Sequence, residues 1–250
     1  ALSDLVDLRV DNYTWCDDRH NYLTAQQKRI ISEVTLTDKN GSEKAYPPDW
    51  KEEIENFEYD IDIVLHEHCH RHFWREYKKP KIAYTVWETD RMNDDFFECL
   101  LGYDELWVPS EWQRECAIGQ GYPCDRVKVV PEAVEPDCFP DNAIVPDDSI
   151  FTFCVLGRWD HRKSITEILE CFVELFGNNP KVQLIASIDN RYAEDGLSTE
   201  ERFKKMGWGD IKNIILKSFP SRSKYIDILR RSHVFLSCAR SEGWNIPLIE

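Results

Sequence analysis

The sequence predicts an α/β fold in which two blocks of alternating strands and helices each form a mostly parallel sheet. Short apolar runs of buried-strand type alternate with helical patterns along the chain, and such alternation implies crossover connections between parallel strands. A polar, proline-containing stretch interrupts the alternation before it restarts at Phe151. We therefore predict a first domain over residues 1–140, a linker over 141–149 and a second domain over 150–250.

The expected elements follow from hydrophobic periodicity. In the first block, strands are expected at 60–65, 81–87, 105–108 and 126–130, and helices at 24–34, 49–57, 93–101 and 111–119. In the second block, strands are expected at 151–156, 181–187, 213–216 and 233–237, and helices at 199–206 and 222–231. A further helix after Lys163 carries one apolar stripe, made of Ile165, Ile168, Leu169, Phe172, Leu175 and Phe176.

Composition disfavours several classes of protein. The chain has 250 residues, of which 42% are hydrophobic, so it can bury a sizeable core. The net charge of −15 argues against a nucleic-acid binder, which needs a basic face, and no apolar run reaches the length of a membrane span. The nine cysteines are scattered and form no C-x-x-C pair, which favours reduced core thiols in a cytoplasmic protein.

Two charged patterns in the second block are typical of a ligand site. Glu242 and Glu250 flank a glycine-bearing loop, and Pro247 between them fits the first turn of a helix. Arg158 and Lys163 follow the strand at 151–156, at the strand end where ligands bind in open α/β sheets. On their own the glutamates leave an ordinary surface loop as an alternative, because strand–loop–helix units occur in any α/β protein.

Together, the strand–GR…K–helix pattern and the segment EGWNIPLIE resemble the donor half of retaining glycosyltransferases of the GT-B fold, family 4. The resemblance covers residues 150–250 well and the first half loosely. It implies two Rossmann-like domains with mostly parallel sheets, in a chain that is truncated at both ends. It also implies transfer of a sugar from a nucleotide-diphosphate sugar to an unidentified acceptor, with retention of the anomeric configuration.

The resemblance implies catalytic roles for Arg158, Lys163 and Glu242. The two cations would neutralise the charge that grows on the departing diphosphate, and Glu242 would orient the sugar. Further substrate-binding residues follow from the same resemblance: Gly243, Trp244, Asn245 and Ile246 at the sugar, Glu250 at the ribose, and Lys217, Ser218 and Phe219 near the nucleobase. No metal or other cofactor is expected, because the cations occupy the place where a metal would act.

The sequence departs from the family pattern at two positions. Glu88 follows the strand at 81–87, near a point where family members commonly have a histidine; Glu88 would bind an acceptor hydroxyl or cap the following helix, and both alternatives stay open. Ser164 stands where a glycine commonly follows the lysine. Since serine is a good helix cap, we expect the replacement of glycine by Ser164 to have little effect on the following helix.

Two other patterns suggest metal binding. The histidine cluster at 66–72 could hold zinc, but the preferred interpretation is a strand end that runs into a loop at the interdomain cleft, where His66 or His68 would line the acceptor site. The D-x-D at residues 60–62 lies at the start of a strand, away from the expected site, and is interpreted as a chance match.

Three functions remain possible from the sequence. A glycosyltransferase is preferred, with a glycan, a lipid-linked sugar or a small molecule as acceptor and with neither nucleic acid nor a membrane span involved. A sugar-nucleotide epimerase or hydrolase is the alternative enzyme. A non-catalytic sugar-nucleotide-binding fragment is the third.

Overall fold

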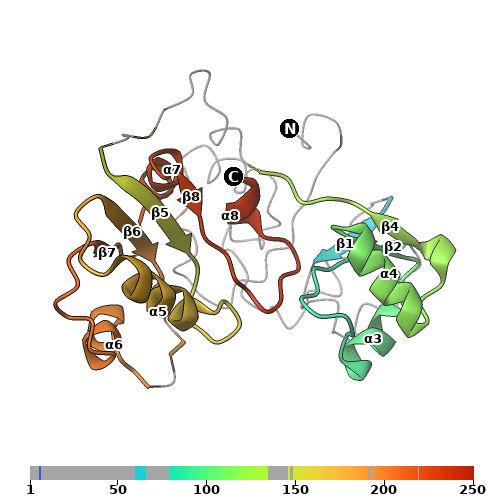
Figure 1. Cartoon of the computed structure of the whole chain (residues 1–250). Helices are drawn as coiled ribbons and strands as arrows, with labels where there is room; N and C mark the ends of the chain where they lie inside the picture. Colours follow the sequence, from blue (N-terminus) through green and yellow to red (C-terminus); the bar gives the residue numbers. More distant parts are fainter. Residues whose placement is uncertain are drawn as a thin grey trace, which may run out of the picture. The chain divides into compact units, whose positions relative to one another are not determined.

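The computed structural model describes residues 6, 60–65, 79–134, 146, 149–190, 192–193, 195–218 and 220–250. The chain divides into two compact units, residues Ala1–Tyr59 and Asp60–Glu250, and every described helix and strand belongs to the second unit (Figure 1). The predicted helices at 24–34 and 49–57, the histidine cluster at 66–72 and Phe219 lie outside the described residues. The predicted domain boundaries at 140 and 150 stay a prediction.

The first sheet is parallel and has the order β1-β2-β3-β4. Its strands are β1 (Asp62–Leu65), β2 (Lys81–Tyr84), β3 (Glu105–Val108) and β4 (Val127–Val129), and its helices are α3 (Asp94–Leu100), α4 (Glu111–Gln120) and the 3-10 helix η5 (Cys124–Arg126). The Asn93 side chain accepts hydrogen bonds from the first turn of α3, and Ser110 caps α4, so local sequence defines both starts.

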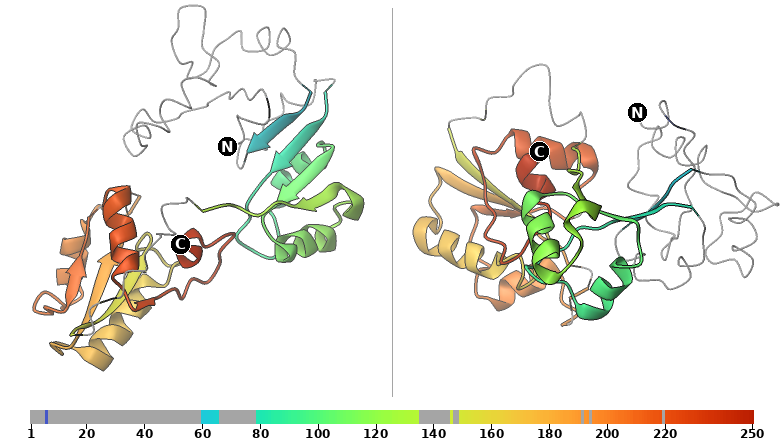
Figure 2. Two further views of the ribbon diagram at one scale, coloured as in Figure 1. Left: turned by 90° about the horizontal axis from the view of Figure 1, so that it is seen from above. Right: turned by 90° about the vertical axis from the view of Figure 1, so that its right-hand side faces the viewer.

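The second sheet is also parallel, but its strand order is β7-β6-β5-β8. The strands are β5 (Phe151–Leu156), β6 (Val182–Ser187), β7 (Ile214–Leu216) and β8 (Val234–Phe235), and the helices are α5 (Ile165–Phe176), α6 (Thr199–Lys205), α7 (Arg222–Arg230) and α8 (Ile246–Ile249). The chain leaves β5 in one direction to β6 and β7, and returns to the other side of β5 as β8 (Figure 2). The space between β5 and β8 is therefore a topological switch point, where open α/β sheets bind ligands.

Helices on both faces of β5 build the second core. Because side chains alternate across a strand, Val155 packs on the face of α5, whereas Cys154 and Leu156 pack with Ile228 of α7. The predicted stripe of α5 is buried at Ile165, Ile168, Leu169 and Phe172, and Phe176 is partly buried against the same core.

Leu175 was predicted to belong to this stripe, and that prediction is wrong. Its side chain is 72% exposed. At 3.6 residues per turn, Leu175 falls at the margin of the stripe, which is centred on Ile165 and Phe176. The hydrophobic pattern identifies the helix correctly but makes its buried face too wide, because it includes Leu175.

Among the described residues, the predicted elements agree with the structure within a few residues. The strands at 105–108 and 151–156 match exactly, while the strand predicted at 233–237 is only two residues long. The prediction that the cysteines are core thiols is wrong for Cys124, Cys171 and Cys238, which are exposed. Cys99 and Cys154 are buried, and burial raises the pKa of the Cys154 thiol. Of the described helices, none combines the length and the apolar character that crossing a bilayer requires.

Candidate functional site

Two loops lie at the switch point of the second sheet. The first, residues 157–164, connects β5 to α5, and the second, residues 236–245, connects β8 to α8. Gly157 opens the first loop with a φ of 145°, a backbone conformation that side chains other than glycine rarely adopt. Three of the charged residues predicted from the sequence lie on these two loops: Arg158 and Lys163 on the first, and Glu242 on the second.

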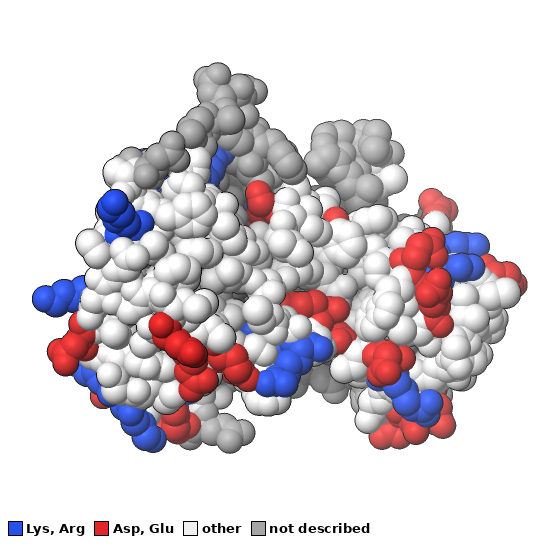
Figure 3. Space-filling model, viewed as in Figure 1, with Lys and Arg blue, Asp and Glu red and all other residues white. Residues whose placement is uncertain are grey.

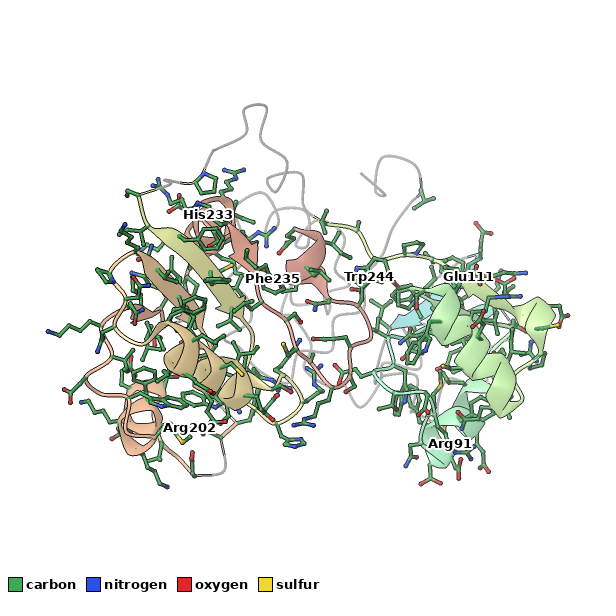
Figure 4. The ribbon with its side chains drawn as sticks, viewed as in Figure 1. Arg91, Glu111, Arg202, His233, Phe235 and Trp244 are labelled. Atoms are coloured by element: carbon green, nitrogen blue, oxygen red, sulfur yellow. The ribbon has the colours of Figure 1, made fainter. Side chains whose placement is uncertain are left out.

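Trp159 anchors the first loop in the core. Its side chain is buried and stacks on Trp208, with the ring centroids 6.4 Å apart. Arg202, labelled on α6 in Figure 4, lies over the indole ring and donates to the Trp159 carbonyl at 3.1 Å. The indole N–H of Trp159 donates to Thr166 on α5 at 2.9 Å. These contacts anchor Trp159 to α5 and α6, next to the charged residues of the loop.

Arg240 binds the second loop to the first. Its backbone N–H donates to the Arg162 carbonyl at 2.7 Å, and its Nε donates to the His161 carbonyl at 3.2 Å. Its guanidinium also pairs with Glu167 in the first turn of α5. A hydrogen bond from its own backbone N–H, together with the one from Arg240, holds the pKa of Glu167 below its usual range.

Lys163 and Arg162 hold the two oxygens of one carboxylate. Lys163 Nζ pairs with Oε1 of Glu242, while Arg162 Nη1 donates to Oε2 of Glu242 at 3.1 Å. The side chains of Lys163, Glu242 and Arg162 are 18%, 21% and 23% exposed, so water only partly screens their charges. The loops thus bring two of the three predicted catalytic residues into direct contact.

Arg158, the third predicted catalytic residue, has a different set of partners. Its Nε lies 3.5 Å from Oδ2 of Asp160, and its guanidinium carbon lies 5.8 Å from the centroid of the Tyr192 ring. Asp160 in turn accepts a hydrogen bond from the backbone N–H of Lys163 at 2.9 Å. Arg158 is therefore linked to Lys163 through Asp160 rather than through Glu242.

Glu250 lies in a separate, buried cluster. Its side chain is only 3% exposed and its Oε1 is 2.7 Å from Arg222 Nη2, while Tyr225 donates to Oε2 at 2.6 Å. It lines a cavity of about 220 Å³, together with residues of α7 and α8, Cys154 of β5 and Phe235 of β8, which is labelled in Figure 4. Both carboxylate oxygens of Glu250 thus have a protein partner, and the side chain borders this cavity.

The remaining predicted site residues are distributed around these loops. A Cβ on Gly243 would collide with the Val86 side chain and lie 3.1 Å from the Trp87 carbonyl oxygen, so this position requires glycine. The indole nitrogen of Trp244 is buried and has no hydrogen-bond partner among the described residues (Figure 4). The Asn245 side chain donates to Ser237 at 2.9 Å.

Ile246, Lys217 and Ser218 are placed by the neighbouring elements. Ile246 begins α8. Lys217 and Ser218 follow β7 and are exposed, and Ser218 donates to Asp189 at 3.1 Å. Asp189 follows β6, so this hydrogen bond ties the loop after β7 to the end of β6. Asp189 also accepts a hydrogen bond at 2.6 Å from Thr199, the first residue of α6.

The structure excludes one alternative for Glu88, leaves acceptor binding by Glu88 a prediction, and corrects the expectation for Ser164. Glu88 is not the cap of the next helix, because Asn93 caps α3; it lies 3.1 Å from Arg162 Nη1. Ser164 precedes α5, but its side chain makes no capping hydrogen bond and its φ is 51°. The left-handed backbone explains why glycine suits this position.

Sequence reasoning missed Arg162, Arg240, Arg222 and Tyr225. Arg162 stands next to Lys163 in the sequence, which was a usable signal, whereas no spacing marks the partners of Glu250. Within the described ranges, no three His, Cys, Asp or Glu residues are grouped so that they could hold a metal ion. On the face shown in Figure 3, acidic and basic side chains of the described residues lie next to one another, in keeping with these ion pairs.

Comparison with solved structures identifies the fold. Sucrose-phosphate synthase from Thermosynechococcus elongatus matches with a TM-score of 0.61 and 12% identity, over 85% of this chain and 61% of that chain. HepE from Anabaena, in complex with UDP and glucose, matches with a TM-score of 0.60 and 11% identity, over 87% and 65%. The galactosyltransferase WaaB matches with a TM-score of 0.59 and 14% identity, over 80% and 56%.

This is the α/β fold of GT-B glycosyltransferases. The chain spans 56% of the length of WaaB and 65% of HepE, and at these identities the similarity shows the fold alone. No protein family model matches the sequence, and neither does any curated protein.

Proposed function

We propose that this chain carries the donor-binding half of a glycosyltransferase, which moves a sugar from a nucleotide-diphosphate sugar to an unidentified acceptor. The observation that carries the proposal is the contact of Lys163 and Arg162 with Glu242 between the two loops at the switch point. This is where an open α/β sheet binds its ligand, and it combines cations for a diphosphate with a carboxylate for hydroxyls. The neighbour HepE was solved in complex with UDP-glucose, which favours a UDP-sugar as donor.

The cations have an electrostatic role in this proposal. As the bond to the sugar breaks, negative charge grows on the leaving diphosphate, and fixed cations stabilise that charge most effectively in a partly buried site. Lys163 has three N–H donors, so it can bind a diphosphate oxygen while it still contacts Glu242. Arg158, half-exposed beside Asp160, would bind the same diphosphate.

Glu242 would bind hydroxyls of the transferred sugar. A carboxylate accepts about four hydrogen bonds, and the cations leave acceptor positions on both oxygens for a ligand. Glu250 would accept from the ribose through its cavity, and residues 217–219 would lie near the base. The backbone of residues 243–246 would help Glu242 to orient the transferred sugar. No protein nucleophile is assigned. The same proposal includes transfer with retention of the anomeric configuration, as in family 4, and a reaction that needs no metal or other cofactor. It also includes a cytoplasmic location.

A thermal-shift panel tests this proposal. UDP-, GDP- and ADP-sugars are added to the chain in buffer that contains EDTA. We expect one nucleotide series to raise the melting temperature with increasing concentration, since a ligand at 100 times its Kd stabilises a protein by about 2.7 kcal/mol. Absence of any shift would contradict donor binding, and a shift that required added Zn²⁺ or Mn²⁺ would contradict the metal-free mechanism. Conversion of the donor without any acceptor would indicate an epimerase or hydrolase instead.

A further inference from the structure

Arg162 makes more contacts with the loop after β8 than its neighbour Lys163 does. Its Nη1 donates to the Ser241 carbonyl at 2.9 Å and to Oε2 of Glu242 at 3.1 Å. Its own carbonyl accepts the backbone N–H of Arg240 at 2.7 Å. The side chain of Arg162 thus fixes Glu242 twice, once at the carboxylate and once at the peptide group immediately before it.

The hydrogens of Nη1 are fully used by these two bonds. A guanidinium terminal nitrogen carries two N–H groups, and Ser241 and Glu242 accept both of them. Glu88 lies 3.1 Å from the same nitrogen as an ion pair, and its side chain is more exposed than that of Glu242. Arg162 therefore holds the Glu242 carboxylate by one hydrogen bond and the preceding Ser241 carbonyl by the other. Glu88 attracts the guanidinium by its charge but receives neither Nη1 hydrogen.

The two cations that hold Glu242 would respond differently to a donor. In the proposed function Lys163 binds the diphosphate, so its contact with Glu242 is shared with phosphate oxygens once the donor is present. The two Nη1 hydrogens of Arg162 are directed at protein acceptors in the loop after β8. On the proposed function, Arg162 rather than Lys163 would therefore keep the Glu242 carboxylate in place while the donor binds.

We propose that Arg162 is a positioning residue, which acts through Glu242 to select the sugar of the donor and has little effect on its diphosphate. This inference rests on the proposed function, because it assigns Glu242 to the sugar. It makes a specific claim about affinity. A nucleotide sugar binds more tightly than the bare nucleoside diphosphate by the contribution of its sugar, and loss of Arg162 reduces that contribution. The reduction occurs only in a protein whose residue 242 is still a carboxylate.

The test is a double-mutant cycle on the 250-residue chain, with Arg162→Gln, Glu242→Gln and the double variant. Titration calorimetry measures three ligand pairs: UDP with UDP-glucose, GDP with GDP-mannose, and ADP with ADP-glucose. The pair that the wild-type chain binds is used for all variants. Arg231→Gln is the matched control, because it breaks an exposed arginine–carboxylate pair with Asp227 on α7.

Each single substitution should lower the affinity for the nucleotide sugar by about tenfold, which corresponds to the loss of one hydrogen bond to a charged group. The free diphosphate should change by less than about twofold, and Arg162→Lys should recover part of the loss because it keeps the charge. The double variant should remain near tenfold, since the two residues act as one unit. A hundredfold loss in the double variant, or an equal loss for diphosphate and sugar nucleotide, would overturn the inference. Failure of the wild-type chain to bind any pair would instead contradict the proposed function.

Circular dichroism melting of each variant accompanies the titrations. If Arg162→Gln lowers the melting temperature, Arg162→Lys and the Glu242→Gln background still decide the question, because both compare ligands within one folded protein. Arg231→Gln should leave both affinities unchanged.

Discussion

Lys163 and Glu242 are 79 residues apart in the sequence and form an ion pair at the C-terminal ends of β5 and β8. The pair places a cation and a carboxylate at the point where the strand order of the second sheet reverses. In an open α/β sheet this is the place where a ligand binds. The pairing of the charges also explains how both groups remain partly buried.

Lys163→Ala should weaken binding of a nucleoside diphosphate by about tenfold to a few hundredfold, because a hydrogen bond to a charged group contributes roughly 1.5–3 kcal/mol. Arg158→Ala should have an effect of the same kind. Binding of the nucleoside alone should change little in both variants, since it lacks the diphosphate. Calorimetry with uridine, UDP and UDP-glucose measures this, with the exposed Lys205→Ala as control. Unchanged diphosphate affinity in both variants would refute the donor-site assignment.

Glu250→Gln should weaken the nucleoside, the diphosphate and the sugar nucleotide to the same extent, because the ribose is common to all three. It should also lower the free energy of unfolding by about 1–3 kcal/mol, since Arg222 loses the anionic partner that it holds at 2.7 Å. Urea denaturation measures the stability. Asp227→Asn, which removes an exposed ion pair, should cost about 0.5 kcal/mol or less. Preserved uridine binding by Glu250→Gln would exclude Glu250 from the ribose site.

Ser164→Gly should stabilise the protein by up to about 1 kcal/mol. The φ of 51° is unfavourable for serine by roughly 1–2 kcal/mol, and the greater freedom of glycine in the unfolded chain offsets part of this. Ser198→Gly is the matched control, because Ser198 is the N-cap of α6 in a capping box with ordinary φ, so glycine there should destabilise by a few tenths of a kcal/mol. Thermal unfolding of both variants gives the two signs. A lower melting temperature for Ser164→Gly would contradict the prediction that the backbone strain at Ser164 outweighs the entropy cost of glycine.

Tyr84 should make stability depend on pH at alkaline pH. Burial, and secondarily the charge of Glu132, raise the pKa of Tyr84 from 10.0 to about 12, and its hydroxyl donates to the Val130 carbonyl at 3.0 Å. Between pH 10 and about 12 the unfolded chain has lost this proton while the folded chain still holds it. The free energy of unfolding therefore falls as pH rises through this window.

Urea denaturation at several alkaline pH values, in the wild-type chain and in Tyr84→Phe, measures the effect. The difference between the two proteins should be constant below pH 9 and should shrink above it, because phenylalanine has no proton to lose. Parallel pH profiles for the two proteins would disprove the shift.

Local sequence patterns accounted for most elements of the described fold. The periods of two and 3.6 residues identified the strand at 151–156 and the helix α5, because both periods depend only on which side chains face a core. The loops that carry Arg158, Lys163 and Glu242 were located for the same reason, since each follows a recognisable strand. Exposure of Leu175 and of Cys171 was not predicted, because the width of a buried face depends on the neighbouring elements.

By itself, then, the sequence determined the alternation of strands and helices and the charged residues at their ends. Only the tertiary structure decided which of these residues meet. The order β7-β6-β5-β8 brings Arg162 to Glu242 and gives Glu250 its partners Arg222 and Tyr225. Strand order is set by packing between distant segments and leaves no periodic trace in the sequence. The left-handed backbone of Ser164 was also visible only in the tertiary structure, since serine adopts this conformation rarely and its sequence position predicted an ordinary helix cap.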